Sequence, residues 1–381
     1  MKKIMVMLMF VLVAGLVFAG GEQEQGSSDV IKIGVFEPMT GANAAGGAME
    51  VEGIKLANKL YPEVLGKKVE VVIVDNKSDK VEAANAAARL VDKEKVTAII
   101  GSWGSSFSMA AGSIVKEAQI PTVGASCTNP LVTMGNDYYF RVCFIDTFQG
   151  AVMANYAYKE VGARKVAIVQ EISNDYSVGL AKFFTDEFKR LTGDENAIVA
   201  VSNYNTGDMD FTAQVTNLKS LNPDAVFAPG NYTESALLIK QARELGMDVP
   251  FLGGDTWEAP EFLDVGKKNV EGAYFSTFFT TEIPITETSE IFIDEYRKEY
   301  NKEPAAVTAL GFDAYMVILD AIERAGSDDP VAVRDAIATT KGYPGAAGII
   351  TLDATGDAVK NAVIKTVKYG NFAFVTTIVP E

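Results

Sequence analysis

The most constraining feature of the sequence is a unit that occurs twice. It consists of an apolar strand, a loop of small residues, a helix, and a proline that opens the next strand. The first copy is IIGSWGSSFSMAAGSIVKEAQIPTVGAS, residues 99–126, and the second is VFAPGNYTESALLIKQARELGMDVPFLGGD, residues 226–255. Because two parallel strands joined by a helix take a right-handed crossover, the repeat predicts two similar α/β lobes with matching loops.

Each copy lies within a longer alternation of strands and helices. Strands are predicted in a first series at 31–38, 68–76, 96–101 and 121–126, and in a second at 165–171, 197–204, 224–230 and 250–255. Alternation at this spacing predicts parallel sheets with helices on both faces.

The remaining third of the chain does not repeat this unit. Three amphipathic helices are predicted at 289–300, 307–325 and 330–340. Because three such helices are too few for a domain of their own, we expect them to return to the first lobe. A pair of strands, at 362–370 and 371–379, is expected to end the chain.

The absence of histidine limits the chemistry more than any other count. None of the 381 residues is histidine, which excludes Ser-His-Asp and Cys-His nucleophiles and the usual zinc sites. The formal charge of -16, from 50 acidic and 34 basic residues, argues against nucleic acid or an anionic membrane surface as a partner. With 48% hydrophobic residues, the length suggests two ordinary domains with substantial cores.

The first residues have the pattern of a secretory signal. Lys2 and Lys3 precede an apolar run at 4–18, and its 15 residues fall short of the roughly 20 that a membrane-spanning helix needs. Cleavage is expected after Ala19, with residues 20–29 as a flexible leader. No cysteine lies near that site, so a lipid anchor is not indicated. We therefore expect an exported protein, periplasmic or otherwise extracytoplasmic.

The two cysteines, Cys127 and Cys143, leave two alternatives open. In an oxidising compartment they could form a disulfide, but the sequence does not tell whether their Cα atoms lie within reach. Two buried free thiols on adjacent elements are the equal alternative.

The loop at residues 101–106 is the strongest candidate site. In an open α/β sheet ligands bind beyond the carboxyl ends of the strands, and this loop follows a strand and precedes a helix predicted at 108–118. Its N–H groups, its serine hydroxyls and the positive end of the helix favour an anion. The loop is not a P-loop, a dinucleotide fingerprint or a nucleophile elbow. The interpretation that remains for this loop is reversible binding of a carboxylate. The alternative is a tight turn whose serines are solvated.

Other polar side chains that follow strands are separate candidates. Ser126 and Thr128 could form a second wall of the same pocket, although taken alone they fit a polar turn. Asp255 could balance a ligand ammonium, and a turn or helix-capping aspartate is the alternative. Three more candidates follow strands of the second lobe, where they could equally serve packing: Tyr176, Asn231 and Tyr232.

Together these stretches resemble the type I periplasmic binding proteins, in particular the branched-chain (Leu/Ile/Val) amino acid substrate-binding proteins of ABC transporters. The resemblance covers nearly the whole chain after the leader, and it rests on the order of VTAIIGSWGSS, IPTVGASCTNP, YYFRV, DFTAQVTNLKSLNPDAV and GFDAYMVILDAIERAG. It implies an α/β fold of two Rossmann-like lobes with parallel-sheet cores and a ligand cleft between them.

The resemblance also implies how the chain is divided. Three crossovers are expected near 145–148, 276–279 and 351–353. The implied N-terminal lobe is 30–146 plus 279–351, and the implied C-terminal lobe is 147–278 plus 352–381.

By the same resemblance, Ser105 and Ser106 would hold the α-carboxylate of an amino acid, and Asp255 would accept from its ammonium. Ser126 and Thr128 would lie beside the α-amino group. Two roles from the second lobe complete the implied site: Tyr176 closes on the ligand, and either Asn231 or Tyr232 replaces a tyrosine that is usual in branched-chain binders.

This chain departs from the family pattern in the positions of its large side chains. Gly46 and Gly47 stand where many members have an aromatic lid, and Trp103 stands where they have a smaller side chain. Trp103 therefore joins the expected ligand-binding residues, and the preferred ligand side chain is left open.

The sequence thus predicts a non-catalytic, monomeric binding protein that closes over a zwitterionic, apolar amino acid and presents it to an ABC transporter permease. No cofactor, metal or nucleic acid is expected. The alternatives are binding of an amide, an aromatic acid or another small ligand, a ligand sensor without transport, and a lysine- or carboxylate-dependent hydrolase.

Overall fold

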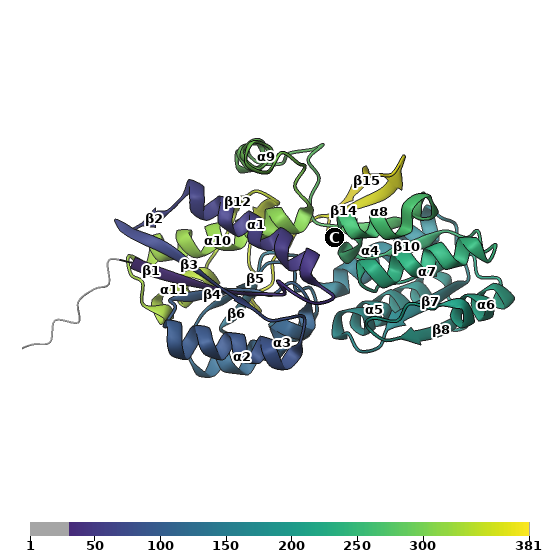
Figure 1. The fold of residues 1–381 in the computed structure, drawn as a ribbon, viewed down its shortest axis with the longest axis horizontal. Coiled ribbons are helices and arrows are strands. Elements are labelled where there is room, and N and C mark those ends of the chain that lie inside the picture. The colour runs from purple at the N-terminus through teal and green to yellow at the C-terminus, as the bar shows by residue number, and fades with distance from the viewer. Residues whose placement is uncertain (1–29, 381) are drawn as a thin grey trace, which may run out of the picture. The chain divides into compact units, whose positions relative to one another are not determined.

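Two large β-sheets organise residues 30–380, the part of the chain that this computed structural model describes (Figure 1). The signal peptide and leader predicted for residues 1–29 lie outside the described residues. No helix in the described part is long and apolar enough to cross a membrane. The predicted α/β fold with two lobes is confirmed.

The first sheet has six strands in the order β2-β3-β1-β4-β5-β6. Its strands are β1 (Val30–Glu37), β2 (Glu63–Val64), β3 (Lys67–Asp75), β4 (Ala98–Ile100), β5 (Thr122–Gly124) and β6 (Tyr139–Arg141). The pairs β1–β4, β4–β5 and β5–β6 are parallel, and β2 pairs antiparallel with β3. Because parallel strands end at the same edge, the loops after β1, β4 and β5 meet there.

Helices cover both faces of this sheet, as its continuous apolar strands require. They are α1 (Ala44–Leu60), α2 (Lys80–Arg89), the π-helical turn η1 (Leu90–Glu94), α3 (Ser105–Glu117), α9 (Glu287–Tyr300), α10 (Ala306–Ala325) and α11 (Pro330–Ala338). Helices α1 and α10 pack together on one side, and α2 and α3 on the other (Figure 1). The late helix α10 therefore returns to the first lobe, as predicted.

The second sheet has seven strands in the order β15-β14-β11-β10-β9-β7-β8. They are β7 (Val166–Glu171), β8 (Ile198–Tyr204), β9 (Ala225–Phe227), β10 (Phe251–Gly253), β11 (Tyr274–Thr277), β14 (Ala362–Lys368) and β15 (Asn371–Ile378). The strands from β7 to β11 pair in parallel, and β14 and β15 add an antiparallel edge, drawn yellow in Figure 1. The predicted final strand pair is thus confirmed.

The helices of this lobe also lie in packed pairs. They are α4 (Asp146–Lys159), α5 (Asp175–Thr192), α6 (Thr212–Leu221), α7 (Tyr232–Glu244) and α8 (Pro260–Gly266). Helix α4 packs on α5, and α7 packs on α8.

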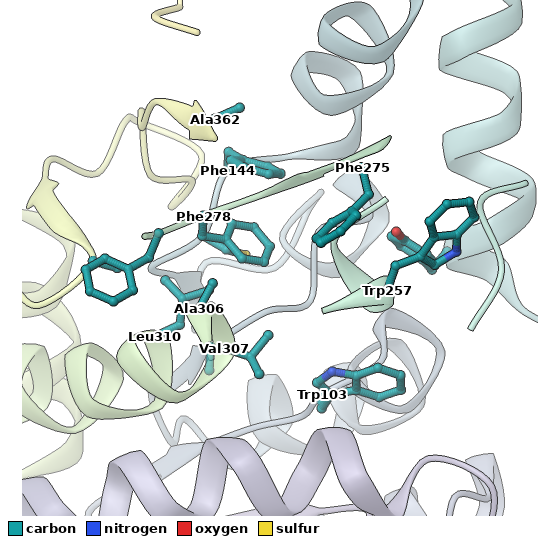
Figure 2. Close-up of a cluster of buried hydrophobic side chains, with 14 of the residues drawn as sticks. Trp103, Phe144, Trp257, Phe275, Phe278, Ala306, Val307, Leu310 and Ala362 are labelled. Atoms are coloured by element: carbon teal, nitrogen blue, oxygen red, sulfur yellow. The ribbon is translucent and has the colours of Figure 1, made fainter. Parts of the chain in front are cut away.

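The chain passes between the two sheets three times. The passages follow β6, β11 and β13 (Gly348–Ile350), which forms a small hairpin with β12 (Tyr343–Gly345). Phe144 from the first passage and Phe278 from the second pack against each other with their rings tilted and the ring centroids 4.3 Å apart (Figure 2). The passages lie where crossovers were expected, while the domain boundaries stay a prediction.

Both cysteines are buried free thiols in the first lobe and the first passage. Burial raises the pKa of Cys127 to about 11, so this thiol stays protonated and unreactive at neutral pH. Of the two alternatives left open by the sequence, the structure has the free thiols.

Candidate functional site

The loop after β4 leads directly into helix α3 and forms one wall of the site. The helix begins at Ser105, three residues before the start expected from its apolar pattern. Gly104 precedes it with φ at 91°, a conformation that favours glycine. Ser105 and Ser106 therefore occupy the first turn, where backbone N–H groups have no partner within the helix. This turn suits a carboxylate, because its N–H groups converge at the positive end of a 13-residue helix.

The hydroxyls of the two serines already have partners. Ser105 Oγ accepts from the backbone N–H of Asn129 at 3.0 Å. Ser106 Oγ donates to Asp175 Oδ2 at 2.8 Å and accepts from the Asp175 N–H at 3.0 Å, so it joins the two lobes. The N–H groups of Phe107 and Ser108 donate to the Gly104 carbonyl, so those of Ser105 and Ser106 remain as donors for an anion. Direct contact of either hydroxyl with a ligand stays a prediction.

Asp255 forms the opposite, acidic part of the site. It follows β10 in the short helical turn η3 (Asp255–Trp257) and is buried. Its Oδ1 accepts from Gln149 Nε2 at 2.8 Å and from the Tyr176 hydroxyl at 2.9 Å. Burial raises the pKa of Asp255 to about 6, while these two hydrogen bonds act against that shift. At neutral pH it is therefore an ionised acceptor suited to an ammonium group.

A small cavity joins the two parts. Its lining residues come from both lobes: Trp103, Gly104, Ser105, Ser126, Asn174, Tyr176, Asn231, Asp255 and Thr256. Its volume is about 10 Å³, which is room for a single water molecule. An amino acid is larger, so entry of such a ligand requires the two walls to separate.

Six of the nine residues predicted for the site line this cavity, and three do not. The three are Ser106, which joins the lobes as described above, Thr128 and Tyr232. Thr128 is buried, and its backbone carbonyl accepts from the Asp146 N–H at 2.9 Å. The Tyr232 hydroxyl donates to the Ala42 carbonyl of the first lobe at 3.2 Å.

Trp103 fills the space that Gly46 leaves open. The indole is 3% exposed and belongs to the buried hydrophobic cluster drawn in Figure 2. A Cβ atom on Gly46 would lie 2.3 Å from Trp103 Cε2, well inside contact distance. The Trp103 ring also lies 5.9 Å from the Tyr232 ring of the other lobe, centroid to centroid. The indole therefore occupies the space that a side chain at position 46 would need, while the departure from the family pattern stays a prediction.

Polar contacts between the lobes surround the cavity. Asn231 Nδ2 donates to Asn43 Oδ1 at 3.0 Å, and Lys80 Nζ lies 2.7 Å from Asp175 Oδ2. These groups come from helix ends that face one another across the cleft, so they hold the lobes in the closed arrangement.

Three buried residues of the site were missed from the sequence: Gln149, Glu37 and Glu50. Gln149 lies in α4, where nothing in the local pattern marks it as a partner of Asp255. Glu37 and Glu50 are fully buried; Glu37 Oε2 accepts from the Trp103 N–H at 2.6 Å, and Glu50 accepts from the Ser126 hydroxyl. A signal for the two glutamates was present in the sequence, because each carboxylate interrupts an apolar pattern. Glu37 does so at the end of a buried strand, and Glu50 on the inner face of α1.

Two α/β lobes that meet around a cavity with an anion-binding turn and a buried carboxylate define a protein that encloses a small ligand between its lobes. The family comparison agrees with this class. The family model described as periplasmic binding protein matches residues 30–371. The chain belongs to this family.

Individual relatives match along nearly their whole lengths. Leu/Ile/Val-binding protein homolog 3 of Brucella melitensis is 30% identical over 335 residues, covering 86% of this chain and 88% of that protein. The structure of the leucine-binding protein LivK of Thermotoga maritima is 46% identical with a TM-score of 0.89, covering 92% of this chain and 99% of that one. LivJ of Streptococcus pneumoniae, solved with isoleucine, is 33% identical with a TM-score of 0.85, at coverages of 92% and 99%.

Proposed function

We propose that this protein is the extracytoplasmic substrate-binding component of an ABC importer and captures an amino acid with an apolar, branched side chain. The observation that carries the proposal is the pairing of opposite polarities around one cavity. The N–H groups of the first turn of α3 suit a carboxylate, and the ionised Asp255 suits an ammonium. The names of the relatives, which bind leucine, isoleucine or valine, support the same ligand class.

Capture follows from contacts that exist only when the lobes are closed. A ligand held by the α3 turn of the first lobe and by Asp255 and Tyr176 of the second gains both sets of interactions only in the closed form. A ligand shifts the equilibrium between open and closed forms only if it makes more contacts in one of them. Because this ligand contacts both lobes only in the closed form, its binding favours closure. The closed form is then the one that a permease recognises.

No catalytic step is part of the proposal. The relatives are named for binding, and the buried Asp255 of the cavity serves here as an acceptor and not as a general acid. The protein releases the amino acid unchanged.

The test is direct binding to protein from which any bound ligand has been removed by unfolding and refolding. Calorimetry and thermal shift against the common amino acids, simple amides and aromatic acids should show selective binding of L-leucine, L-isoleucine or L-valine. The matched control is 4-methylpentanoate, which is leucine without its amine. It should bind at least about 100-fold more weakly, because it leaves the buried Asp255 charge unpaired. Binding of an amide or an aromatic acid with no response to any amino acid would contradict the proposal.

A further inference from the structure

Three helices begin close together where the two lobes meet. Helix α2 begins at Lys80, α3 at Ser105 and α5 at Asp175. Helices α2 and α3 pack together in the first lobe, and α3 contacts α5 of the second lobe. Because the N-terminus of a helix carries a partial positive charge, closure brings positive helix ends of both lobes together.

Asp175 accepts hydrogen bonds from the ends of both first-lobe helices. Its Oδ2 accepts from the Ser106 hydroxyl at 2.8 Å and lies 2.7 Å from Lys80 Nζ. Its backbone takes part as well: the N–H donates to Ser106 Oγ at 3.0 Å, and the carbonyl accepts from Asn129 Nδ2 at 2.9 Å. Burial acts to raise the pKa of Asp175, but the bonds from Lys80 and Ser106 leave it below its usual value. The carboxylate is therefore ionised at neutral pH.

A second cavity lies beside this contact. Its volume is about 240 Å³, and Lys80 and Ser106 are among the residues that line it. Four further lining residues are shared with the ligand cavity: Trp103, Gly104, Asn174 and Asn231. The bonds of Asp175 therefore border the space next to the enclosed ligand, and they must break before the lobes separate there.

We propose that Asp175 is a latch, meaning a positioning residue that determines how long the closed protein retains its ligand. Its carboxylate offsets the positive ends of α2 and α3 and the charge of Lys80, and it reaches them only when the lobes are closed. Because such an interaction forms after capture, it slows dissociation and leaves association unchanged. This role rests on the proposed function, since it concerns the retention of an amino acid.

Asp175→Asn removes the charge with little change of shape. The asparagine oxygen can still accept from Ser106, but the ion pair with Lys80 is lost and the positive helix ends are no longer offset. The dissociation rate constant of L-leucine, measured by stopped-flow tryptophan fluorescence, should rise by about tenfold, as expected when a hydrogen bond to a charged group is weakened. The association rate constant should stay within about twofold of wild type.

Lys80→Met tests the ionic part of the latch. The pair with Asp175 is about half exposed, so this variant should raise the dissociation rate constant by only about two- to threefold. In the Asp175→Asn background it should have no further effect. Raising NaCl from about 0.05 M to about 0.5 M should likewise speed dissociation from wild type by about twofold and leave Asp175→Asn unchanged, because salt screens exposed charges.

The matched control is Asp186→Asn on the same helix, whose exposed carboxylate pairs with Lys182 of that helix. It should leave both rate constants within about twofold of wild type. Urea unfolding of each ligand-free variant confirms folding, and if Asp175→Asn were unstable, Lys80→Met and the salt series would test the latch by themselves.

The kinetic outcomes separate a latch from other roles of Asp175. Slower association with unchanged dissociation would reveal a merely structural role and overturn the latch. Tighter binding by Asp175→Asn would show that Asp175 repels the ligand carboxylate, and equal effects of Lys80→Met with and without Asp175 would show that the pair is not the cause. Either result would overturn the latch, as would salt-independent dissociation from wild type. A wild-type protein that does not bind L-leucine would overturn the latch together with the proposed function.

Discussion

At the scale of single residues, the shape of the ligand pocket depends on a tryptophan and on the glycine beneath it. Trp103 places its indole where a side chain on Gly46 would have to lie. The indole also contacts Tyr232 from the other lobe, so the same ring is part of the wall and of the closed interface. The size of the accepted ligand therefore depends on both positions together.

Gly46→Ala should disturb the pocket although it adds a single methyl group. The new Cβ would lie 2.3 Å from Trp103 Cε2, so the indole must move toward the cavity. We expect about a tenfold or greater loss of leucine affinity by calorimetry, in line with the roughly 1–3 kcal/mol that overpacking costs. Adding Trp103→Leu should recover part of the lost affinity, because the smaller side chain leaves room for the new methyl group. Equal losses in the two backgrounds would show that the indole is not the cause.

Asp255→Asn tests the ammonium partner with little change of shape. The asparagine oxygen can still accept from Gln149 or Tyr176, but the negative charge is lost. Affinity for L-leucine should fall by about 100-fold or more, whereas 4-methylpentanoate should bind no worse than to wild type. Asp264→Asn, at an exposed position, serves as the control. An unchanged leucine affinity of Asp255→Asn would remove the ammonium role.

At the scale of elements, the first lobe depends on two helices that are far apart in the sequence and approach closely. A Cβ on Gly53 of α1 would lie 1.9 Å from the Thr308 carbonyl oxygen of α10. A Cβ on Gly311 of α10 would lie 2.3 Å from the carbonyl oxygen of Glu50. Both obstacles are backbone atoms, which cannot rotate away. This contact joins two helices that are about 250 residues apart in the chain and holds the backbone at Glu50 in place.

Gly53→Ala should therefore destabilise the protein despite the higher helix propensity of alanine. We expect a loss of about 1–3 kcal/mol or more in the free energy of unfolding, measured with urea. Gly112→Ala in α3 is the matched control, because its Cβ would meet nothing closer than Asn136 Nδ2 at 3.5 Å. That change should be neutral or stabilising by about 0.5–1 kcal/mol. Equal effects of the two substitutions would contradict close packing of α1 on α10.

At the scale of the whole molecule, buried acids couple ligand binding and stability to pH. Burial raises the pKa of six carboxyls in the described part of the two lobes: Glu37, Glu50, Asp146, Glu171, Asp255 and Asp313. An acid whose pKa is higher in the fold than in the unfolded chain binds more protons when folded. The free energy of unfolding therefore decreases as pH rises through that interval. An ammonium ligand needs the ionised form of Asp255, so binding has the opposite dependence.

The two trends should be visible in one titration. Between pH 7.5 and 5, the midpoint of thermal unfolding of the ligand-free protein should rise as pH falls. Over the same range leucine affinity should decline, by about tenfold at pH 5 for an acid with a pKa of about 6. Asp255→Asn should remove most of the pH dependence of binding. An affinity that stays constant down to pH 5 would contradict this assignment.

The sequence by itself determined the features that depend on local pattern. Apolar runs, helical periodicity and the glycines and prolines between them predicted most strands, the return of α10 and the final strand pair. The loop after β4 and Asp255 were singled out because ligands of parallel sheets bind where strands end, and both line the cavity, while their contact with a ligand stays a prediction. The start of α3 was predicted three residues too late, because its first turn at Ser105 is polar and an apolar pattern does not indicate a polar turn.

Only the tertiary structure decided which side chains meet across the sequence. Gln149 against Asp255, Ser106 against Asp175 and Glu37 behind Trp103 are pairs separated by 66 to 106 positions. No local pattern encodes such a pair, because burial, hydrogen bonding and pKa depend on the neighbours that folding supplies. The polarity of the pocket was therefore readable from the sequence, whereas the groups that orient and tune it became visible only once the lobes were assembled.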